Sequence, residues 1–320
     1  MEEKEIGGYF ELEGGYGKEF HSGIALNSGR NCLQLLIREY RIKTIYLPYY
    51  LCLVINDTCL DEQVKIVYYH INKEFLPELS DISLDQSSYV YIVNYFGFLE
   101  KSTIKELKKK YRNIIIDNTH AFFDEAVENV PTIYNCRKYF GVPDGAYLSA
   151  EIKDFKSYPI AKSSQRMSHL IGRMEETANR HYSEFLKADQ TFDHCNIEQM
   201  SKLTHSLLKN INYQKAKEIR EQNFAFLNEK LKEMNQITID NVCYFMYPLL
   251  IKDGSKLRDD LISHKIYIPK LWPELDCFPL NEFEQNVFEN LVCIPIDQRY
   301  SLTEMKYMVK LIFKYLGGVA

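Results

Sequence analysis

An uninterrupted apolar run ends in a carboxylate in the stretch Ile114-Ile115-Ile116-Asp117-Asn118-Thr119-His120. Three consecutive β-branched residues predict a strand that is covered on both faces, as in a parallel sheet. The carboxyl ends of strands in open α/β sheets face the ligand crevice, so we expect Asp117 at a binding site. A buried carboxylate needs a cation or water there, because burying it unpaired is costly. Asp117 could equally be a simple cap for the turn that follows it.

Short apolar runs and helical patterns alternate before this stretch. Apolar runs of strand length fall at 24–27, 44–47, 64–69 and 89–93, and a helical pattern lies at about 101–111. Alternation of this kind predicts an α/β fold with a mostly parallel central sheet flanked by helices.

The pattern changes after about residue 160. Long helical patterns come first and shorter strand and helix patterns follow, at about 164–187, 197–209, 212–234, 242–247, 249–251, 256–264, 291–294 and 302–316. This mixture predicts a smaller α+β unit. A chain of 320 residues is too long for a single small hydrophobic core. We therefore expect a large domain over 1–195 and a small C-terminal α+β domain over 196–320.

The composition excludes several classes of protein. The chain has 39 basic and 44 acidic residues, a net charge of −5, and no basic tract of the kind that binds nucleic acid. No apolar run approaches the roughly 18 residues that cross a bilayer, and because the N-terminus is acidic and lacks an apolar segment, we expect no secretion signal. The eight cysteines show no Cys-x-x-Cys or Cys/His spacing that would bind a metal. We expect a cytoplasmic protein with neither a metal site nor a membrane partner.

A second candidate residue, Lys138, lies in the segment Tyr134-Asn135-Cys136-Arg137-Lys138-Tyr139-Phe140-Gly141-Val142-Pro143-Asp144-Gly145. A nucleophilic lysine needs a lowered pKa, from burial or from a neighbouring positive charge such as that of Arg137. Without such an environment the pair would be two solvated cations in a hairpin loop. The local sequence leaves both interpretations open.

A third candidate is the turn Asn27-Ser28-Gly29-Arg30-Asn31, between a predicted strand and a predicted helix. Free N–H groups and the helix dipole at such a position can bind an anion, and Ser28 adds a hydroxyl donor. Ser28 could instead serve only as the helix N-cap. The turn matches neither a Walker A loop nor a Gly-x-Gly-x-x-Gly motif.

Taken in order, these segments resemble the DegT/DnrJ/StrS family of sugar aminotransferases, which depend on pyridoxal phosphate (PLP). Further segments of the chain contribute to the resemblance: Leu47-Pro48-Tyr49-Tyr50-Leu51-Cys52, Asn94-Tyr95-Phe96-Gly97, Pro143-Asp144-Gly145-Ala146, Arg220-x-x-Asn223 and Cys293-Ile294-Pro295-Ile296-Asp297. The resemblance implies a fold-type-I homodimer with its active site at the subunit interface. It also implies a small-molecule amino donor, glutamate in most members, and a keto-sugar nucleotide or similar carbonyl acceptor.

The resemblance also implies roles for individual residues. Lys138 would bind PLP as a Schiff base and carry the protons of the reaction, first as base and then as acid. Asp117 would hold the pyridine nitrogen, and His120 would meet the ring hydroxyl. The implied cofactor-binding set is Ser28, Gly29, Arg30, Tyr50, Cys52, Asn94, Asp117, His120, Asn135 and Lys138.

The sequence departs from the family pattern at several of these positions. Cys52 stands where the aromatic residue that stacks on the cofactor is expected, so Tyr49 or Tyr50 could stack instead. Asn135 replaces a serine that binds phosphate. Two alternatives therefore stay open: a non-catalytic or regulatory relative, and a PLP-dependent sugar dehydratase. The dehydratases of the family carry histidine where this chain has Lys138.

Overall fold

The computed structural model describes residues 9–79 and 84–317. An eight-stranded sheet forms its centre, in the order β1-β8-β7-β6-β5-β2-β3-β4. The strands are β1 (Ile24–Leu26), β2 (Thr44–Pro48), β3 (Lys65–Ile71), β4 (Pro77–Glu78), β5 (Ser88–Val93), β6 (Ile114–Asp117), β7 (Thr132–Asn135) and β8 (Ala146–Ser149).

The middle of the sheet is parallel, as the sequence predicts. Strands β7, β6, β5, β2 and β3 pair in parallel, while β1, β8 and β4 add antiparallel edges. Every residue of β6 is buried, which agrees with its uninterrupted apolar run. The strand that decides the fold class therefore lies in the interior of the sheet, and Asp117 stands at its carboxyl end.

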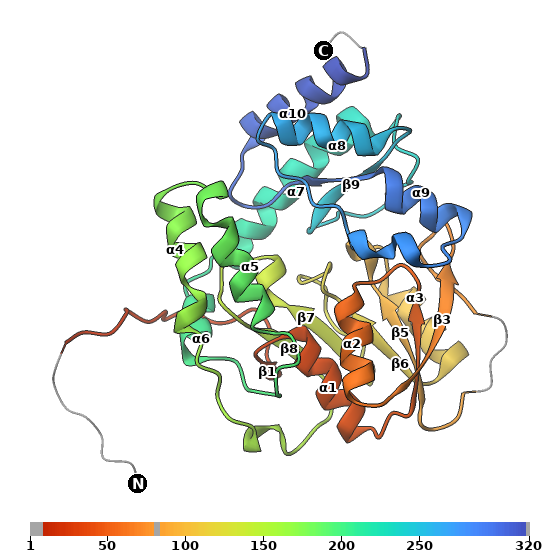
Figure 1. The fold of residues 1–320 in the computed structure, drawn as a ribbon, viewed down its shortest axis with the longest axis vertical. Helices are drawn as coiled ribbons and strands as arrows, with labels where there is room; N and C mark the ends of the chain where they lie inside the picture. Colours follow the sequence, from red (N-terminus) through yellow and green to blue (C-terminus); the bar gives the residue numbers. More distant parts are fainter. Residues whose placement is uncertain (1–8, 80–83, 318–320) are drawn as a thin grey trace.

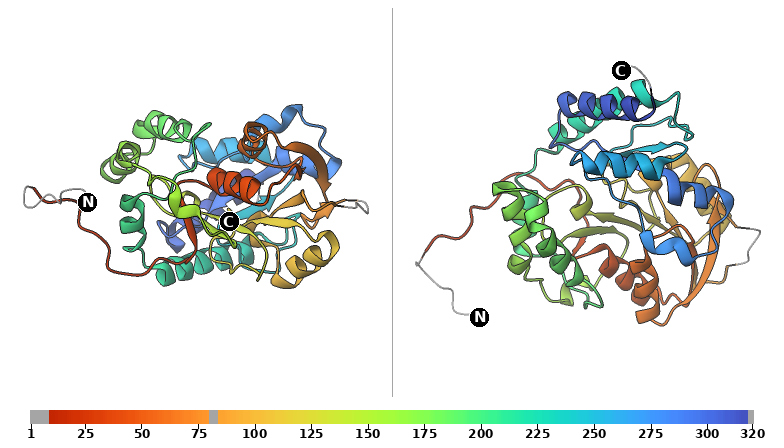
Figure 2. Two further views of the ribbon diagram at one scale, coloured as in Figure 1. Left: turned by 90° about the horizontal axis from the view of Figure 1, so that it is seen from below. Right: turned by 45° about the horizontal axis from the view of Figure 1, so that its top comes forward.

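Helices cover both faces of the sheet (Figures 1 and 2). Helices α1 (Gly29–Glu39) and α2 (Leu53–Asp61) pack together, and α1 also contacts β1, β7 and β8. Helix α3 (Lys101–Tyr111) packs on β6. Short 3-10 helices occur at Tyr95–Gly97, Cys136–Lys138, Phe155–Ser157, Ser164–Arg166, Asn179–His181 and Pro273–Cys277.

The C-terminal part forms a second, smaller layer at the top of Figure 1. It contains an antiparallel pair of strands with helices packed around it. Its elements are α7 (Tyr213–Leu231), β9 (Met246–Leu250), α8 (Gly254–Ser263), α9 (Glu282–Asn290), β10 (Leu291–Pro295) and α10 (Leu302–Tyr315). Helices α9 and α10 each begin with a complete capping box.

The prediction of one long helix over 164–187 is wrong. The segment instead forms a hairpin of α4 (Ser168–Glu175) and α5 (Tyr182–Gln190). The His181 ring bonds to Glu176 at 2.9 Å and to Glu184 at 3.2 Å, which ties the two helices together. A Cβ atom on Gly172 would lie 2.3 Å from the His181 ring, so the glycine permits this close approach.

Two other predicted boundaries are corrected. The helix expected over 197–209 begins only at α6 (Lys202–Leu208). The residues before it bond instead to the backbone of β1 and of the residue after it, through Met200 N–Ala25 O at 3.1 Å and Asn27 N–Glu198 O at 3.0 Å. The strand expected over 242–247 begins only at Met246. The carbonyl groups just before it accept hydrogen bonds from a side chain instead of from a neighbouring strand.

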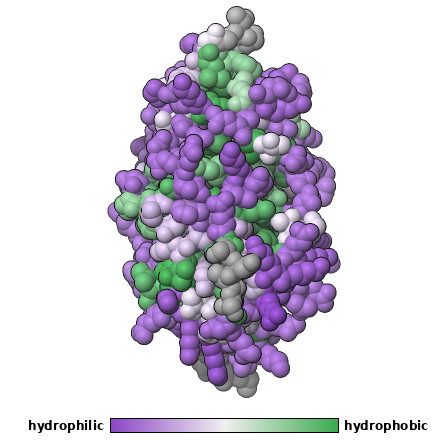
Figure 3. All heavy atoms as spheres, turned by 90° about the vertical axis from the view of Figure 1, so that its right-hand side faces the viewer, coloured by the Kyte–Doolittle hydropathy of each residue, from purple (hydrophilic) through white to green (hydrophobic). Residues whose placement is uncertain are grey.

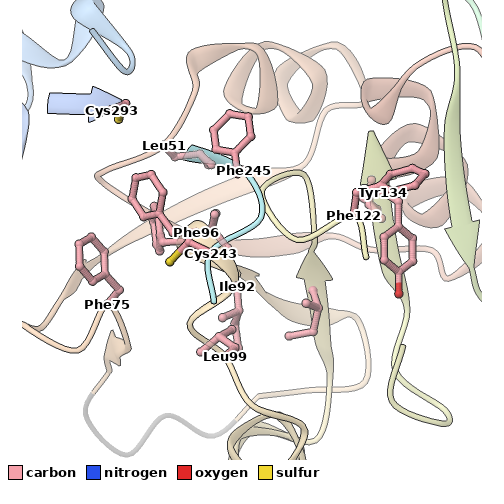
Figure 4. Packing of buried hydrophobic residues seen from close by; sticks show 14 of the residues in the cluster. Leu51, Phe75, Ile92, Phe96, Leu99, Phe122, Tyr134, Cys243, Phe245 and Cys293 are labelled. Carbon is pink, nitrogen blue, oxygen red and sulfur yellow. The ribbon is translucent and has the colours of Figure 1, made fainter. Parts of the chain in front are cut away.

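The face of the molecule seen in Figure 3 is mostly hydrophilic, with scattered apolar residues. The apolar interior is continuous between the two layers. Phe245, next to β9, belongs to the same buried cluster as Leu51 and Phe96, which lie just after strands β2 and β5 of the large sheet (Figure 4). The small layer is therefore packed onto the carboxyl edge of the large sheet.

Candidate active site

Asp117 is buried at the carboxyl end of β6, with 6% of its surface exposed. Its Oδ2 accepts a hydrogen bond from the Tyr91 hydroxyl at 2.8 Å, and its Oδ1 accepts one from Thr119 N at 2.9 Å. Burial raises the pKa of Asp117, and these two bonds and the charge of Lys138 oppose that rise. In residues 9–79 and 84–317 no basic side chain forms an ion pair with it, so the carboxylate can accept a cation.

His120 lies close to Asp117 in the chain and is also buried. Its ring stacks on Phe245 with centroids 4.2 Å apart and an interplanar angle of 13°. Its Nδ1 is buried without a hydrogen-bond partner among the described residues. Burial, and to a smaller degree the charge of Lys138, lowers the pKa of His120 to about 3. The ring is therefore neutral, and it keeps one unused polar atom in the interior.

Lys138 ends a 3-10 helix that follows β7, and its side chain is exposed. It lines a cavity of about 830 Å³ between the large sheet, the α4–α5 hairpin and the small layer. Its charge lowers the pKa of both Asp117 and Cys52, so the three groups lie within electrostatic reach of one another. Asp117 and His120 are buried and are not part of the cavity wall.

Ser28 caps α1, as the simpler interpretation predicts. Its Oγ accepts from Asn31 N at 3.3 Å and donates to the Asn31 side chain at 2.9 Å. Asn135 caps the 3-10 helix of Lys138 by accepting from Arg137 N at 3.0 Å. A Cβ on Gly29 would lie 3.7 Å from the Asn135 amide nitrogen, so the two caps are neighbours. Two helix starts therefore converge next to Lys138.

Arginine side chains surround these helix starts, a feature that the sequence does not reveal. Arg137 pairs with Asp189 at 2.9 Å and stacks over the Phe192 ring at 4.4 Å. Arg166 covers the same ring at 4.3 Å, and Arg30 pairs with Asp193 at 3.1 Å. Burial first, and then the charges of Arg30 and Arg166, lower the pKa of Arg137 despite its partner Asp189. This region is therefore rich in positive charge.

The other predicted site residues have different surroundings. Tyr50 is buried and packs edge-on against Trp272, with centroids 4.8 Å apart. Tyr49 stacks on Tyr68 at 5.0 Å. Cys52 begins α2. Burial raises the pKa of its thiol, and the charge of Lys138 opposes that rise.

Asn94 is fully buried and supports the loop after β5. Its amide nitrogen donates to Asn118 at 3.0 Å, and its oxygen accepts from Leu99 N at 2.8 Å. Both the nitrogen and the oxygen of the Asn94 amide therefore already have hydrogen-bond partners within the protein. These hydrogen bonds link the loop after β5 to the turn that follows Asp117.

The cavity wall carries more positive than negative side chains. Its charged residues are Arg137, Lys138, Arg173, Arg220, Lys265 and Arg299 on the basic side, and Asp297 and Glu304 on the acidic side. Tyr267, Tyr300 and Tyr307 add aromatic surface. This balance contrasts with the overall charge of −5, so the cavity favours an anionic ligand.

Comparison with known proteins identifies the fold. A DegT/DnrJ/EryC1/StrS aminotransferase from Brucella abortus is 12% identical over 91% of this chain and 85% of its own, with a TM-score of 0.62. NtdA from Bacillus subtilis with bound PMP is 11% identical over 91% of this chain and 72% of its own, with a TM-score of 0.67. PseC from Helicobacter pylori, an aminotransferase in pseudoaminic acid biosynthesis, is 12% identical over 91% and 85%, with a TM-score of 0.61.

These similarities show that the chain has the fold-type-I aminotransferase fold. No protein-family model matches the sequence, and no curated protein matches it. The part of the chain that the structure describes has no cluster of His, Cys, Asp and Glu side chains suited to a metal ion. Nor does that part include a helix long and apolar enough to span a bilayer.

Proposed function

We propose that this chain is a PLP-dependent aminotransferase of the DegT/DnrJ/EryC1/StrS type that transfers an amino group from an amino acid, glutamate in our proposal, to a keto-sugar nucleotide. One observation carries the proposal: Asp117, a buried carboxylate that forms no ion pair within the described part of the chain, lies within electrostatic reach of the exposed Lys138 at the carboxyl edge of the sheet. The sugar aminotransferases with the same fold support it.

The residues at this edge fit PLP. Asp117 has no charge partner among the described residues and suits a protonated pyridine nitrogen. His120 keeps a buried Nδ1 without a partner, which suits the ring hydroxyl. The convergent helix starts at Ser28 and Asn135, with Arg30 beside them, suit the phosphate. Cys52 stands where the family has the stacking aromatic residue, so the ring would contact this small thiol, or Tyr49 or Tyr50 in its place.

When bound, PLP supplies an electron sink that makes the carbon next to a nitrogen acidic. The protein supplies the positioned groups. Asp117 keeps the pyridine nitrogen protonated, because a carboxylate stabilises a cation beside it. Lys138 would hold the cofactor through Nζ, and its free amine would carry the proton of the reaction. The neutral His120 would offer Nδ1 as a fixed hydrogen-bonding partner for the ring hydroxyl.

The cavity beside Lys138 supports an anionic acceptor. Its excess of basic side chains would attract the two phosphates of a nucleotide sugar, and its tyrosines offer flat surfaces for a base.

We further propose a division into a large domain, 1–195, and a small one, 196–320. We also propose a homodimer with its site at the interface; exposed apolar side chains on the α4–α5 hairpin support it, namely Ile171, Met174, Tyr182, Phe185 and Leu186.

The test is cofactor binding followed by turnover. Purified protein mixed with PLP is expected to show an absorbance band near the visible edge, and Lys138→Ala is expected to lose it. Lys105→Ala, on the exposed side of α3, is the matched control and should keep the band. Conversion of glutamate to 2-oxoglutarate then separates a transaminase from a dehydratase, which would leave glutamate unchanged. Absence of PLP binding by the unmodified protein would favour the non-catalytic alternative.

A further inference from the structure

Arg220, on α7, is a buried arginine that forms no ion pair among the described residues, although Asp297, the partner of Arg299, lies within electrostatic reach of it. Only 1% of its surface is exposed, and among the described residues no carboxylate lies within ion-pair distance of it. All of its hydrogen bonds run to amide oxygens. Its Nε donates to Gln298 Oε1 at 2.8 Å, and its NH1 group donates to the carbonyls of Tyr244 and Phe245, the latter at 3.4 Å.

The remaining hydrogen bond of Arg220 reaches the residue that follows Lys138. Its NH2 group donates to the Tyr139 carbonyl at 3.2 Å, and its guanidinium stacks over the Tyr139 ring at 4.6 Å. Gln298 donates to the same carbonyl at 3.0 Å. Two side chains of the small layer therefore donate hydrogen bonds to the same backbone carbonyl, which belongs to the residue after Lys138 in the lysine segment (residues 137–140).

Tyr139 extends this link to the other side of the proposed site. Its hydroxyl donates to the His120 carbonyl at 2.8 Å. Phe245, whose carbonyl accepts from Arg220, stacks on the His120 ring. Arg220 thus fixes the segment of Lys138, the ring of His120 and the start of β9 relative to one another.

An apolar side chain of similar length could fill the space of Arg220 without the cost of burying a charge. What the guanidinium adds is a rigid set of directed donors. On the basis of the proposed function, we infer that Arg220 is a positioning residue: through the Tyr139 carbonyl it aims Lys138 at the cofactor aldehyde. Its role would be indirect, because its hydrogen bonds run to Tyr139, Tyr244, Phe245 and Gln298 and none runs to Lys138 itself.

The attachment reaction gives a direct readout of this role. Lys138 Nζ attacks the aldehyde carbon of PLP, a carbon–nitrogen double bond forms, and one water leaves. Borohydride reduces that bond, so the fraction attached at each time after mixing can be counted by peptide mass. A misplacement of about 1 Å in such a step costs up to about 100-fold in rate.

The experiment compares two buried residues of α7. In Arg220→Met we expect attachment to slow by about 10- to 100-fold. Asn223→Ala is the control, because Asn223 is equally buried and its side chain donates to the Ile296 and Tyr300 carbonyls and not to the backbone around Lys138. We expect it to stay within about twofold of the unmodified protein. Arg220→Lys should recover part of the rate, because one directed donor remains.

Equal slowing in Arg220→Met and Asn223→Ala, or no slowing in either, would overturn the inference. If Arg220→Met does not fold, Gln298→Ala removes the second donor to the same carbonyl from a partly exposed loop, and an unchanged attachment rate there would also overturn it. Failure of the proposed function looks different: the unmodified protein itself would then show no borohydride-trapped PLP on Lys138.

Discussion

The Tyr91 hydroxyl donates a hydrogen bond of 2.8 Å to Asp117 Oδ2 from the neighbouring strand. Both side chains are buried, and their strands run parallel with Val93 opposite Asp117. The bond lowers the pKa of Asp117 against the rise that burial causes. Tyr91 thus helps to keep the carboxylate ionised, which is the state that would hold a protonated pyridine.

Tyr91→Phe should weaken PLP binding. Loss of this donor raises the pKa of Asp117 further and leaves one oxygen without its partner. A hydrogen bond to a charged group is worth about 1.5–3 kcal/mol, so we expect the dissociation constant to rise by about 10- to 100-fold. Tyr111→Phe is the control, because the Tyr111 hydroxyl is buried without a partner among the described residues. Equal effects of both variants on PLP titrations would contradict this role for Tyr91.

Arg137→Gln should weaken PLP more than pyridoxal, which lacks the phosphate. Arg137 is one of the cations around the convergent helix starts, and its loss removes about one charge-assisted contact. We expect the PLP dissociation constant to rise by about tenfold and that of pyridoxal to change by less than about threefold. Arg38→Gln, which breaks the surface pair with Glu62, should change neither. A parallel loss for both ligands would place Arg137 outside the phosphate site.

Asp124→Asn should stabilise the protein above about pH 6. Burial raises the pKa of Asp124 to about 6, so the folded state holds a proton more tightly than the unfolded state, whose value is 3.8. The contribution of Asp124 to stability therefore falls as pH rises from about 4 to about 6, and stays low above that. Because the side chain is partly exposed, we expect a gain of only about 1–2 kcal/mol at pH 7 in urea unfolding. The same gain at pH 3.5 would argue against this titration.

Glu284→Gln should destabilise the contact between the small layer and the large sheet. The fully buried Glu284 accepts from Ile71 N at 2.8 Å, Asn281 N at 2.9 Å and the His70 ring at 2.7 Å. The amide leaves at least one of these donors unpaired, at a cost of about 1–3 kcal/mol in urea unfolding. The matched variant Glu304→Gln changes an exposed capping box on α10 and should cost less than about 1 kcal/mol. A reversed order would show that the contact is not stabilising.

The sequence by itself determined the elements whose signals are local. The run before Asp117 specifies a buried parallel strand because apolar β-branched side chains favour that environment on both faces. Ser28 specifies the start of α1, and Ser301 with Glu304 specifies that of α10, because caps bond within one turn. The equivalent box of Asn281 and Glu284 was present as well, but that helix was not predicted.

Only the tertiary structure decided the features that depend on distant partners. The break between α4 and α5 follows from the approach of His181 to Gly172, and no local breaker marks it. The bond between Tyr91 and Asp117 joins residues 26 apart, and that of Arg220 to Tyr139 joins residues 81 apart. Hydrogen bonds of this kind form only when packing brings strands and layers together, so residue type and spacing could indicate candidates for a site but not their geometry.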